Sequence, residues 1–180
     1  MEDFLNIDKV MRKTKDKRNL KVTLKHHDVK GSALYAKKKI KKGEVVAYYM
    51  FKLFDREGYE SPTDFEYAMK VYDKNDKIIR KYKGDIDETC MPKPKRSIPY
   101  WGIFANEPSP GEISNVELDS NNAANNKTKM KAGKHLTYKL MATRDIKRGD
   151  EILWNYGDSY PREYDVADEE ESSTESESTD

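Results

Sequence analysis

One nine-residue pattern occurs twice in the chain, at residues 36–44 (AKKKIKKGE) and 142–150 (ATRDIKRGD). In both copies an alanine is followed after three residues by an isoleucine, and after two more by a glycine and an acid. Glycine adopts a positive φ at little cost, so Gly43 and Gly149 each predict a tight turn. An apolar run follows each turn, VVAYYMF in the first copy and EILWNY in the second. The repeat therefore predicts two similar β-hairpins in a β-rich fold, with chance recurrence of lysine-rich hairpins as the alternative.

Outside the repeat, regular apolar spacing is found in a few short segments. Residues 1–18 have apolar positions at loosely helical spacing, which predicts a short amphipathic helix. Strands are predicted at 20–24 (LKVTL) and 136–142, and residues 77–82 are a further strand candidate. Residues 64–72 fit either a strand or a helix. The expected fold is therefore mainly β with short helices.

The composition fits one globular domain without a membrane segment. A chain of 180 residues can bury one core, and no apolar run is long enough to span a bilayer. The N-terminus lacks the apolar centre of a secretory signal, so we expect an intracellular protein without membrane contact. Cys90 is the only cysteine, which excludes an internal disulfide and any zinc site built from several cysteines. We expect no metal.

Charge is distributed unevenly along the chain. Residues 168–180 (DEEESSTESESTD) hold 7 acidic side chains and no basic one, which predicts a disordered acidic tail. The rest of the chain holds all 34 Lys and Arg residues, many of them between Lys9 and Lys42. This basic body is most simply a solvated surface, with nucleic-acid contact as the alternative. In the same way, PKPKR at 92–96 is a solvated loop or a weak nuclear-import signal.

Three segments that are far apart in the sequence occur in a recognisable order. They are residues 31–44 (GSALYAKKKIKKGE), 104–116 (FANEPSPGEISNV) and 142–157 (ATRDIKRGDEILWNYG). Together they resemble the SET-domain family of protein lysine methyltransferases. The first is similar to the family's opening glycine turn and strand, the second to a divergent Asn-His-Ser motif that ends at Asn115, and the third to the last core motif. The resemblance implies several small curved β-sheets and a C-terminal pseudoknot, in which the C-terminal segment passes beneath an earlier loop.

The resemblance also implies a domain layout. A lead-in at 1–19 precedes a SET-like domain at 20–164, and the acidic tail follows at 165–180. Within the domain, a variable insert at about 51–100 is expected to contact the substrate.

By resemblance, Tyr156 takes the position of the family's catalytic tyrosine, and Tyr49 and Trp154 complete the catalytic and substrate-channel residues. Methyl transfer to an amine needs a lysine that is deprotonated, aligned and shielded from water, and a channel of tyrosines supplies these conditions. Trp154 precedes Tyr156 by two residues, so a regular strand puts both on one face. The bulky Trp154 predicts a narrow channel that favours mono- or dimethylation. The alternative is that both tyrosines only fill the core.

The cofactor that the resemblance implies is S-adenosyl-L-methionine. Asn106 is expected to bind its methionine ammonium group, Glu107 to offer backbone groups to its adenine, and Tyr156 to border it. The opening turn is expected to contact the methionine carboxylate and ribose through Lys30, Gly31, Ser32, Ala33 and Leu34. The chain departs from the family pattern where Ala33 replaces a glycine and where Glu107 and Pro108 replace His and Ser.

The zinc-bearing flanks of many family members cannot form from one cysteine, so other residues must complete the channel. Tyr160, together with Tyr164, is a candidate aromatic lid, with a plain surface segment as the alternative. The implied substrate is a protein lysine, with a histone tail as the suspected partner and a nuclear, chromatin location. The main alternative is a catalytically weak SET-like module that binds chromatin or protein partners, and a basic nucleic-acid binder is a third hypothesis. The sequence leaves a homodimer open.

Overall fold

The computed structural model describes residues 3–73, 75, 77–119 and 130–157. The expected acidic tail and the lid candidates Tyr160 and Tyr164 lie outside the described residues. Within the described ranges, no helix combines the length and apolar character that crossing a membrane requires.

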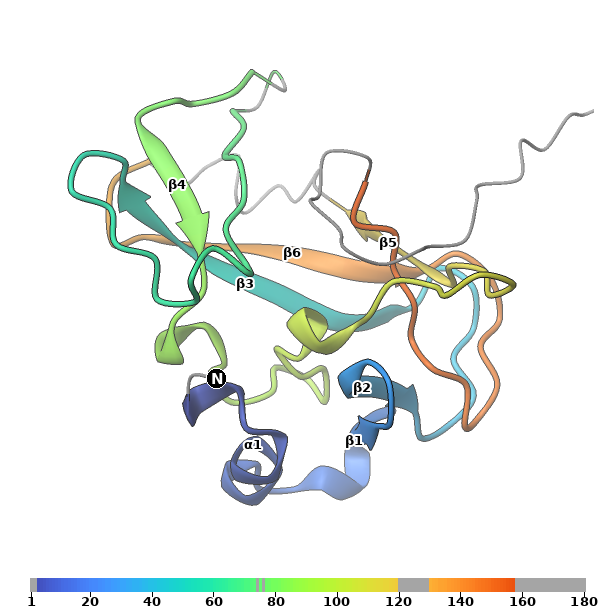
Figure 1. Cartoon of the computed structure of the whole chain (residues 1–180). Coiled ribbons are helices and arrows are strands. Elements are labelled where there is room, and N and C mark those ends of the chain that lie inside the picture. Colours follow the sequence, from blue (N-terminus) through green and yellow to red (C-terminus); the bar gives the residue numbers. More distant parts are fainter. Residues whose placement is uncertain (1–2, 74, 76, 120–129, 158–180) are drawn as a thin grey trace, which may run out of the picture.

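Two antiparallel sheets form the framework of the molecule (Figure 1). The larger has the strand order β4 (Tyr82–Asp85), β3 (Val45–Asp55), β6 (His135–Ala142) and β5 (Val116–Asp119). The smaller pairs β1 (Val22–His27) with β2 (Gly31–Ala36). One hydrophobic cluster joins the two sheets, and its fully buried side chains include Phe51, Leu140 and Leu34. The expected mainly β fold is confirmed.

The short helices lie in the connections between strands. They are η1 (Asp3–Leu5), α1 (Ile7–Lys13), η2 (Lys17–Asn19), η3 (Glu88–Cys90) and η4 (Gly102–Phe104). The predicted N-terminal helix is observed as α1. The Asn6 side chain caps the start of this helix by accepting hydrogen bonds from the amides of Asp8 and Lys9. Leu5 and Ile7 are buried, so the lead-in packs against the core.

The strand predictions differ in accuracy. Strands predicted at 20–24 and 136–142 are observed as β1 and β6. The candidate at 77–82 is wrong, because Ile78 makes only an isolated bridge with Tyr72 and β4 begins at Tyr82. Residues 64–72 form turns with isolated bridges instead of a helix or a strand.

The two copies of the repeat pair with each other, and each also closes its own turn with one backbone hydrogen bond. Ile40 and Ile146 exchange both backbone hydrogen bonds, with N–O distances of 3.0 and 2.8 Å. The Gly43 amide donates to the Ala142 carbonyl and the Gly149 amide donates to the Ala36 carbonyl, both at 2.8 Å. The predicted hairpins are therefore wrong, since β2 and β3 lie in different sheets and the amides of Gly43 and Gly149 donate to the other copy.

The C-terminal segment, residues 151–157, threads through a loop. Leu153 forms a parallel bridge with Asn106, and Trp154 forms one with Val116. The segment thus lies between the two ends of the loop that joins those residues, which is the expected pseudoknot. In Figure 1 the orange-red end of the described chain runs beside the yellow loop, between β2 and β5.

The segment expected to be a variable insert begins inside β3. Phe51 and Leu53 are strand residues with no exposed surface, and they pair with β6 and β4. Beyond β3, the chain crosses back to β4, where Met69 and Gly84 exchange backbone hydrogen bonds. A Cβ atom at Gly84 would lie 2.7 Å from the Met69 side chain and 2.8 Å from Phe51. Glycine at this position therefore allows the insert to pack closely on the sheet.

Candidate active site

A cavity of about 670 Å³ lies where the N-terminal lead-in, β3, the insert and the threaded C-terminal segment meet. Its volume is in the range of sites that hold a cofactor-sized ligand. Eight residues singled out in the sequence line it: Lys30, Gly31, Ser32, Tyr49, Asn106, Glu107, Trp154 and Tyr156. The fold therefore brings together side chains that are up to 126 positions apart in the sequence, from Lys30 to Tyr156.

Three aromatic rings form one wall of this cavity. The Trp154 ring contacts Tyr49 at a centroid distance of 5.7 Å and Tyr156 at 4.9 Å, both edge to face. Tyr49 comes from β3, and the other two come from the C-terminal segment. The expectation that Trp154 and Tyr156 share a face agrees with this contact. Such a wall suits an alkyl chain that ends in a positive charge.

The hydroxyl group of Tyr156 has a defined role as a donor. It donates to the Ala105 carbonyl at 2.7 Å. Because a phenol carries one proton, the remaining lone pairs of this oxygen can only accept. The proton of this hydroxyl is therefore directed toward Ala105.

Two polar groups have unused hydrogen-bonding capacity at the cavity. Asn106 Nδ2 donates to the Ser32 carbonyl at 3.0 Å and to Glu151 Oε1 at 3.2 Å, which fixes the orientation of the amide. Among the residues that the structure describes, none donates to Asn106 Oδ1 and none bonds to the Ser32 hydroxyl. The site can therefore offer an acceptor and a hydroxyl to a polar ligand.

Glu107 stands where the family pattern has histidine, and its side chain is used in the fold. The carboxylate is buried and accepts a hydrogen bond from the Tyr156 amide at 2.9 Å. This bond connects the loop after η4 to the C-terminal segment. The departure at Glu107 therefore supports the position of Tyr156.

Asn115 holds the same segment from its other side. Its Oδ1 accepts from the Leu153 amide at 2.9 Å, and its Nδ2 donates to the Glu151 carbonyl at 2.7 Å. Only 4% of Asn115 is exposed. The side chain therefore acts as a strand partner for the threaded backbone.

A partly buried charge cluster lies beside the cavity and was not predicted from the sequence. The Lys30 ammonium lies 2.8 Å from Glu112 Oε2 and 3.2 Å from Glu151 Oε2. Burial alone would raise the pKa of Glu112, but hydrogen bonds from Lys30 and the Ser109 amide lower it. The two acids lie 82 and 121 positions from Lys30, so no local pattern could reveal the cluster.

A hydrogen-bonded group that was not predicted from the sequence attaches the insert to β4. Asp85 has no exposed surface, and its carboxylate accepts from the hydroxyls of Tyr59, Ser61 and Thr63. Burial first, and then this hydrogen bond, raise the pKa of Tyr59 to about 12. These hydrogen bonds to Asp85 hold the first part of the insert against the sheet. The insert residues that line the cavity follow directly: Glu66, Tyr67, Ala68 and Met69.

Some predicted site residues are not brought to the cavity. Ala33 and Leu34 are consecutive residues of β2 with no exposed surface, and neither lines the cavity. Tyr160 lies outside the described residues, and its place in the channel remains a prediction.

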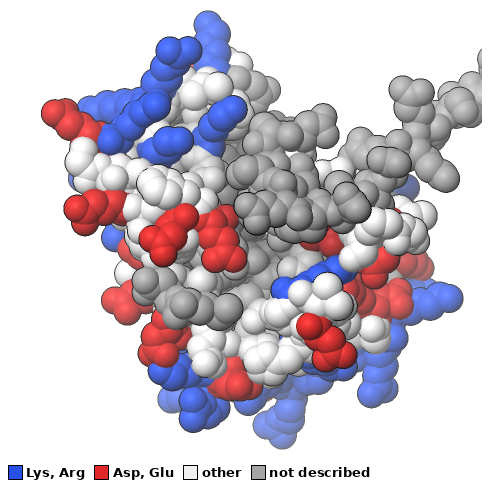
Figure 2. Space-filling view, viewed as in Figure 1, with Lys and Arg blue, Asp and Glu red and all other residues white. Residues whose placement is uncertain are grey.

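The basic body does not form one continuous face in the view of Figure 2. Lys and Arg side chains gather at the upper left, around β4, and along the lower edge, near α1 and β1. Asp and Glu side chains lie between these two groups. The charge pattern on this face therefore differs from the single basic stripe that is typical of nucleic-acid binding proteins.

The small antiparallel sheets, the threaded C-terminal segment and the aromatic cavity define a knotted β fold with a site at the knot. The family model of the SET domain matches residues 31–157, most of the chain. The chain belongs to the SET-domain family. This span coincides with the three motifs recognised in the sequence.

Solved structures of other proteins are similar to this chain at low sequence identity. One is ATXR5 in complex with histone H3.1, with a TM-score of 0.50, 16% identity, and coverage of 81% of this chain and 60% of that chain. Another is a candidate histone methyltransferase from Plasmodium falciparum, with a TM-score of 0.49, 19% identity, and coverage of 78% and 96%. A search of curated protein sequences finds no match.

Proposed function

We propose that the chain is a protein lysine methyltransferase that uses S-adenosyl-L-methionine. Membership of the SET-domain family supports a protein methyltransferase. The observation that carries the proposal is one cavity lined both by the rings of Tyr49, Trp154 and Tyr156 and by the polar residues Asn106 and Ser32. An apolar aromatic wall fits a lysine side chain, and the polar groups fit an amino-acid-like cofactor.

The residues present fit the cofactor. Asn106 Oδ1 is an acceptor for the methionine ammonium group, and the Ser32 hydroxyl is a partner for the carboxylate or ribose. Gly31 has a φ of +77°, and a Cβ atom placed on it would have no neighbour within 4 Å, so its backbone leaves room for a ligand. S-adenosyl-L-methionine would supply the methyl group as a sulfonium.

The chain's own residues would position and dehydrate the target lysine. The rings of Tyr49 and Trp154 exclude water from its alkyl chain, and this desolvation lowers the pKa of its amine. The lone pairs of the Tyr156 hydroxyl, whose proton is donated to Ala105, would accept a hydrogen bond from the amine and orient it. Positioning of this kind supplies a large part of the rate without a strong base.

The proposed substrate is a lysine in a basic protein segment, with a histone tail as the leading candidate. The ATXR5 structure that shares this fold contains histone H3.1, and this supports the choice of a histone as the first substrate to test. A histone substrate would place the protein at chromatin in the nucleus.

The test is methyl transfer from labelled S-adenosyl-L-methionine to mixed histones and to a broad protein extract. Tyr156→Phe should lower the rate by about 100- to 1,000-fold, the usual effect of removing one preorganised polar group from an active site. Tyr48→Phe is the matched control, because Tyr48 packs on Tyr100 at 5.0 Å and does not line the cavity. We expect this control to keep the parent rate.

Two results would contradict the proposal in different ways. Absence of labelling together with absence of cofactor binding by calorimetry would reject the enzyme. Tight cofactor binding without transfer to any protein would favour the alternative of a catalytically weak SET-like binding module, for which the replacements at Glu107 and Pro108 are the sequence argument.

A further inference from the structure

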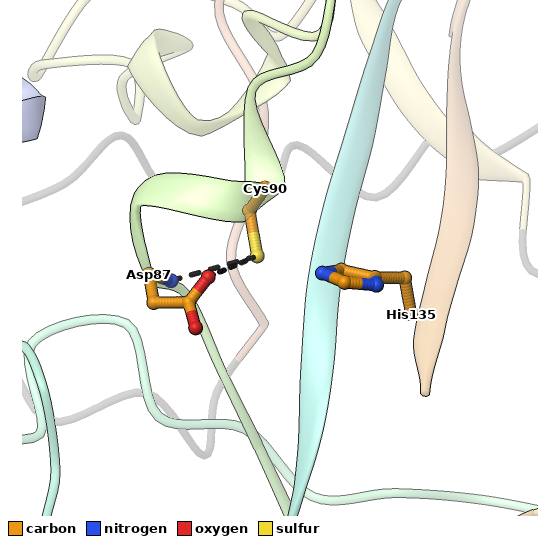
Figure 3. Close-up of side chains that lie close together, drawn as sticks. All are labelled: Asp87, Cys90 and His135. Atoms are coloured by element: carbon orange, nitrogen blue, oxygen red, sulfur yellow. Dashed lines mark hydrogen bonds between the residues drawn. The ribbon is translucent and has the colours of Figure 1, made fainter. Parts of the chain in front are cut away.

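Three side chains of metal-binding type converge away from the cavity. Asp87 precedes η3, Cys90 ends it, and His135 begins β6. Their ligand atoms all lie within 4.8 Å of one another. Figure 3 shows the His135 ring pointing toward the thiol and carboxylate across β3. None of the three lines the cavity, so this cluster is separate from the candidate active site.

The spacing of the cluster is close to that of a tetrahedral metal site. Cys90 Sγ lies 3.7 Å from Asp87 Oδ1. Zinc bonds of about 2.0–2.3 Å at tetrahedral angles put two donor atoms about 3.3–3.6 Å apart. The Asp87 and Cys90 pair is therefore nearly in place, and a His135 nitrogen lies within 4.8 Å of both donor atoms.

Neighbouring groups orient the Asp87 carboxylate as a ligand. The Lys52 ammonium lies 2.9 Å from Oδ2, and the Thr89 amide lies 2.9 Å from Oδ1, the oxygen that faces the thiol. Burial alone would raise the pKa of Asp87, but the hydrogen bonds from Thr89 and Lys52 lower it. Hydrogen-bonded carboxylates of this kind are typical of metal sites, where outer groups fix the ligands.

The Thr89 hydroxyl now connects the two sides of the cluster. It bonds to Asp87 Oδ1 and lies 2.6 Å from His135 Nε2. Only 1% of Cys90 is exposed, and burial raises the pKa of its thiol to about 11. A cation at this position would take over the connecting role of the hydroxyl and provide the charge that a buried thiolate requires.

We propose that Asp87, Cys90 and His135 bind a divalent transition-metal ion, with Zn²⁺ as the preferred ion. Sulfur, imidazole nitrogen and carboxylate oxygen are the zinc donor set, whereas Mg²⁺ and Ca²⁺ prefer oxygen alone. On binding, the Cys90 thiol releases its proton to solvent and a metal–sulfur bond forms; a solvent oxygen fills the fourth position. Such a site needs one cysteine, so it replaces the expectation of no metal without conflict with the cysteine count.

The ion would connect two parts of the fold. η3 follows β4 at the end of the insert, while His135 starts the central strand β6. A bound ion would fix the end of the insert to the sheet. Metal binding should therefore raise the melting temperature of the chain, because the site forms only in the folded state.

The experiment is a metal titration of the full chain after chelator treatment. Zn²⁺ is titrated against a chromophoric chelator, and Co²⁺ serves as a spectroscopic probe of thiolate coordination and tetrahedral geometry. We expect one ion per chain, a thiolate-to-cobalt charge-transfer band, and affinity that is lower by at least about tenfold in Cys90→Ser and in His135→Gln. His26→Gln is the control for adventitious surface histidines, since the His26 side chain is 71% exposed, and it should keep the parent affinity.

X-ray absorption of the unmutated chain with one equivalent of Zn²⁺ provides a second test, which does not depend on whether a variant folds. A sulfur shell at about 2.3 Å supports the proposal. A coordination shell without sulfur, or parent affinity in folded Cys90→Ser, overturns it. Neither readout depends on methyltransferase activity.

Discussion

The two copies of the repeat have the same backbone interactions but lead into different structures. Each turn donates its glycine amide to the alanine carbonyl of the other copy, and the two isoleucines pair across the centre. After the first copy, β3 has a hydrogen-bonded strand on each side. After the second copy, the C-terminal segment has only isolated bridges, and the side chains of Asn115 and Glu107 hold it.

This difference distinguishes a strand of the structural framework, β3, from the C-terminal segment that lines the cavity. The backbone of β3 is hydrogen-bonded to a strand on each side, so it needs no side-chain groups as hydrogen-bond partners. The C-terminal segment lies in the middle of the knot, where its rings can line a cavity because few neighbouring strands cover them. Tyr48, the first-copy counterpart of Trp154, packs on Tyr100 and does not reach the cavity. The less regular segment after the second copy therefore carries Trp154 and Tyr156, while the regular strand after the first copy supplies Tyr49.

The largest expected effect comes from removing the side-chain support of the second copy. Asn115→Ala leaves the Leu153 amide and the Glu151 carbonyl without their partner, which should lower the free energy of unfolding by about 2–5 kcal/mol. Urea denaturation measures the change. Asn75→Ala, on an exposed turn, should stay within about 0.5 kcal/mol of the parent. Similar losses in both variants would contradict the dependence of this segment on Asn115.

The next effect tests the likeness of the two turns. Gly43 and Gly149 have φ values of +84° and +93°, and no atom lies within 4 Å of a Cβ placed on either. Alanine should therefore cost only the backbone strain of a positive φ, about 1–2 kcal/mol at each position. Thermal or urea unfolding of Gly43→Ala and Gly149→Ala measures this. Clearly unequal losses would show that the turns are not equivalent.

A smaller effect is expected on the methylation product, and it rests on the proposed function. Trp154→Phe removes ring volume from the cavity wall, so the ratio of trimethylated to monomethylated product should rise by about tenfold. Mass spectrometry of the product measures the ratio. Tyr48→Phe should leave it unchanged. Trimethyl-lysine as the main product of the parent chain would contradict the narrow channel.

The smallest effect concerns the ion pair where the two copies meet. Asp145 is exposed, and its pKa lies below the usual value of 3.8, first because of the Lys42 amide and then because of Lys39. A lowered folded pKa stabilises the fold above pH 3.8, and this stabilisation is lost as the pH falls through the folded value. Asp145→Asn should thus be slightly less stable than the parent near neutral pH, with a difference that shrinks in acid. Urea unfolding midpoints of both proteins, measured from neutral pH down through the pKa of Asp145, test this prediction. A stability difference that grows as the pH falls would contradict it.

The sequence predicted most of what depends on local patterns. The turns at Gly43 and Gly149, the strands at 20–24 and 136–142, and the N-terminal helix follow from spacing within a few residues. Hairpin pairing was wrong because a local pattern does not say whether a turn's partner is the neighbouring strand or the distant copy. The pseudoknot came from the family resemblance, since no periodicity encodes threading.

The candidate site also contains some residues that local sequence motifs identify and others that they do not. The aromatic residues and Asn106 could be placed from motifs, whereas Glu151, Glu112 and Asp85 could not. Lys30 and Glu151, for example, are 121 positions apart, and their contact exists only once the C-terminal segment has passed through the loop. Ala33 and Leu34 match the opening motif in sequence, but both are fully buried in β2 and do not line the cavity.

The threaded segment has a consequence for synthesis of the protein. A ribosome releases β1, β2 and β3 long before residues 151–157, so a nascent chain can form much of the framework while it lacks Trp154 and Tyr156. Those residues reach the cavity only when the last part of the described chain enters the loop between Asn106 and Val116. A chain interrupted before that point has no complete aromatic wall. The order of translation thus makes completion of the knot the last step in building the site.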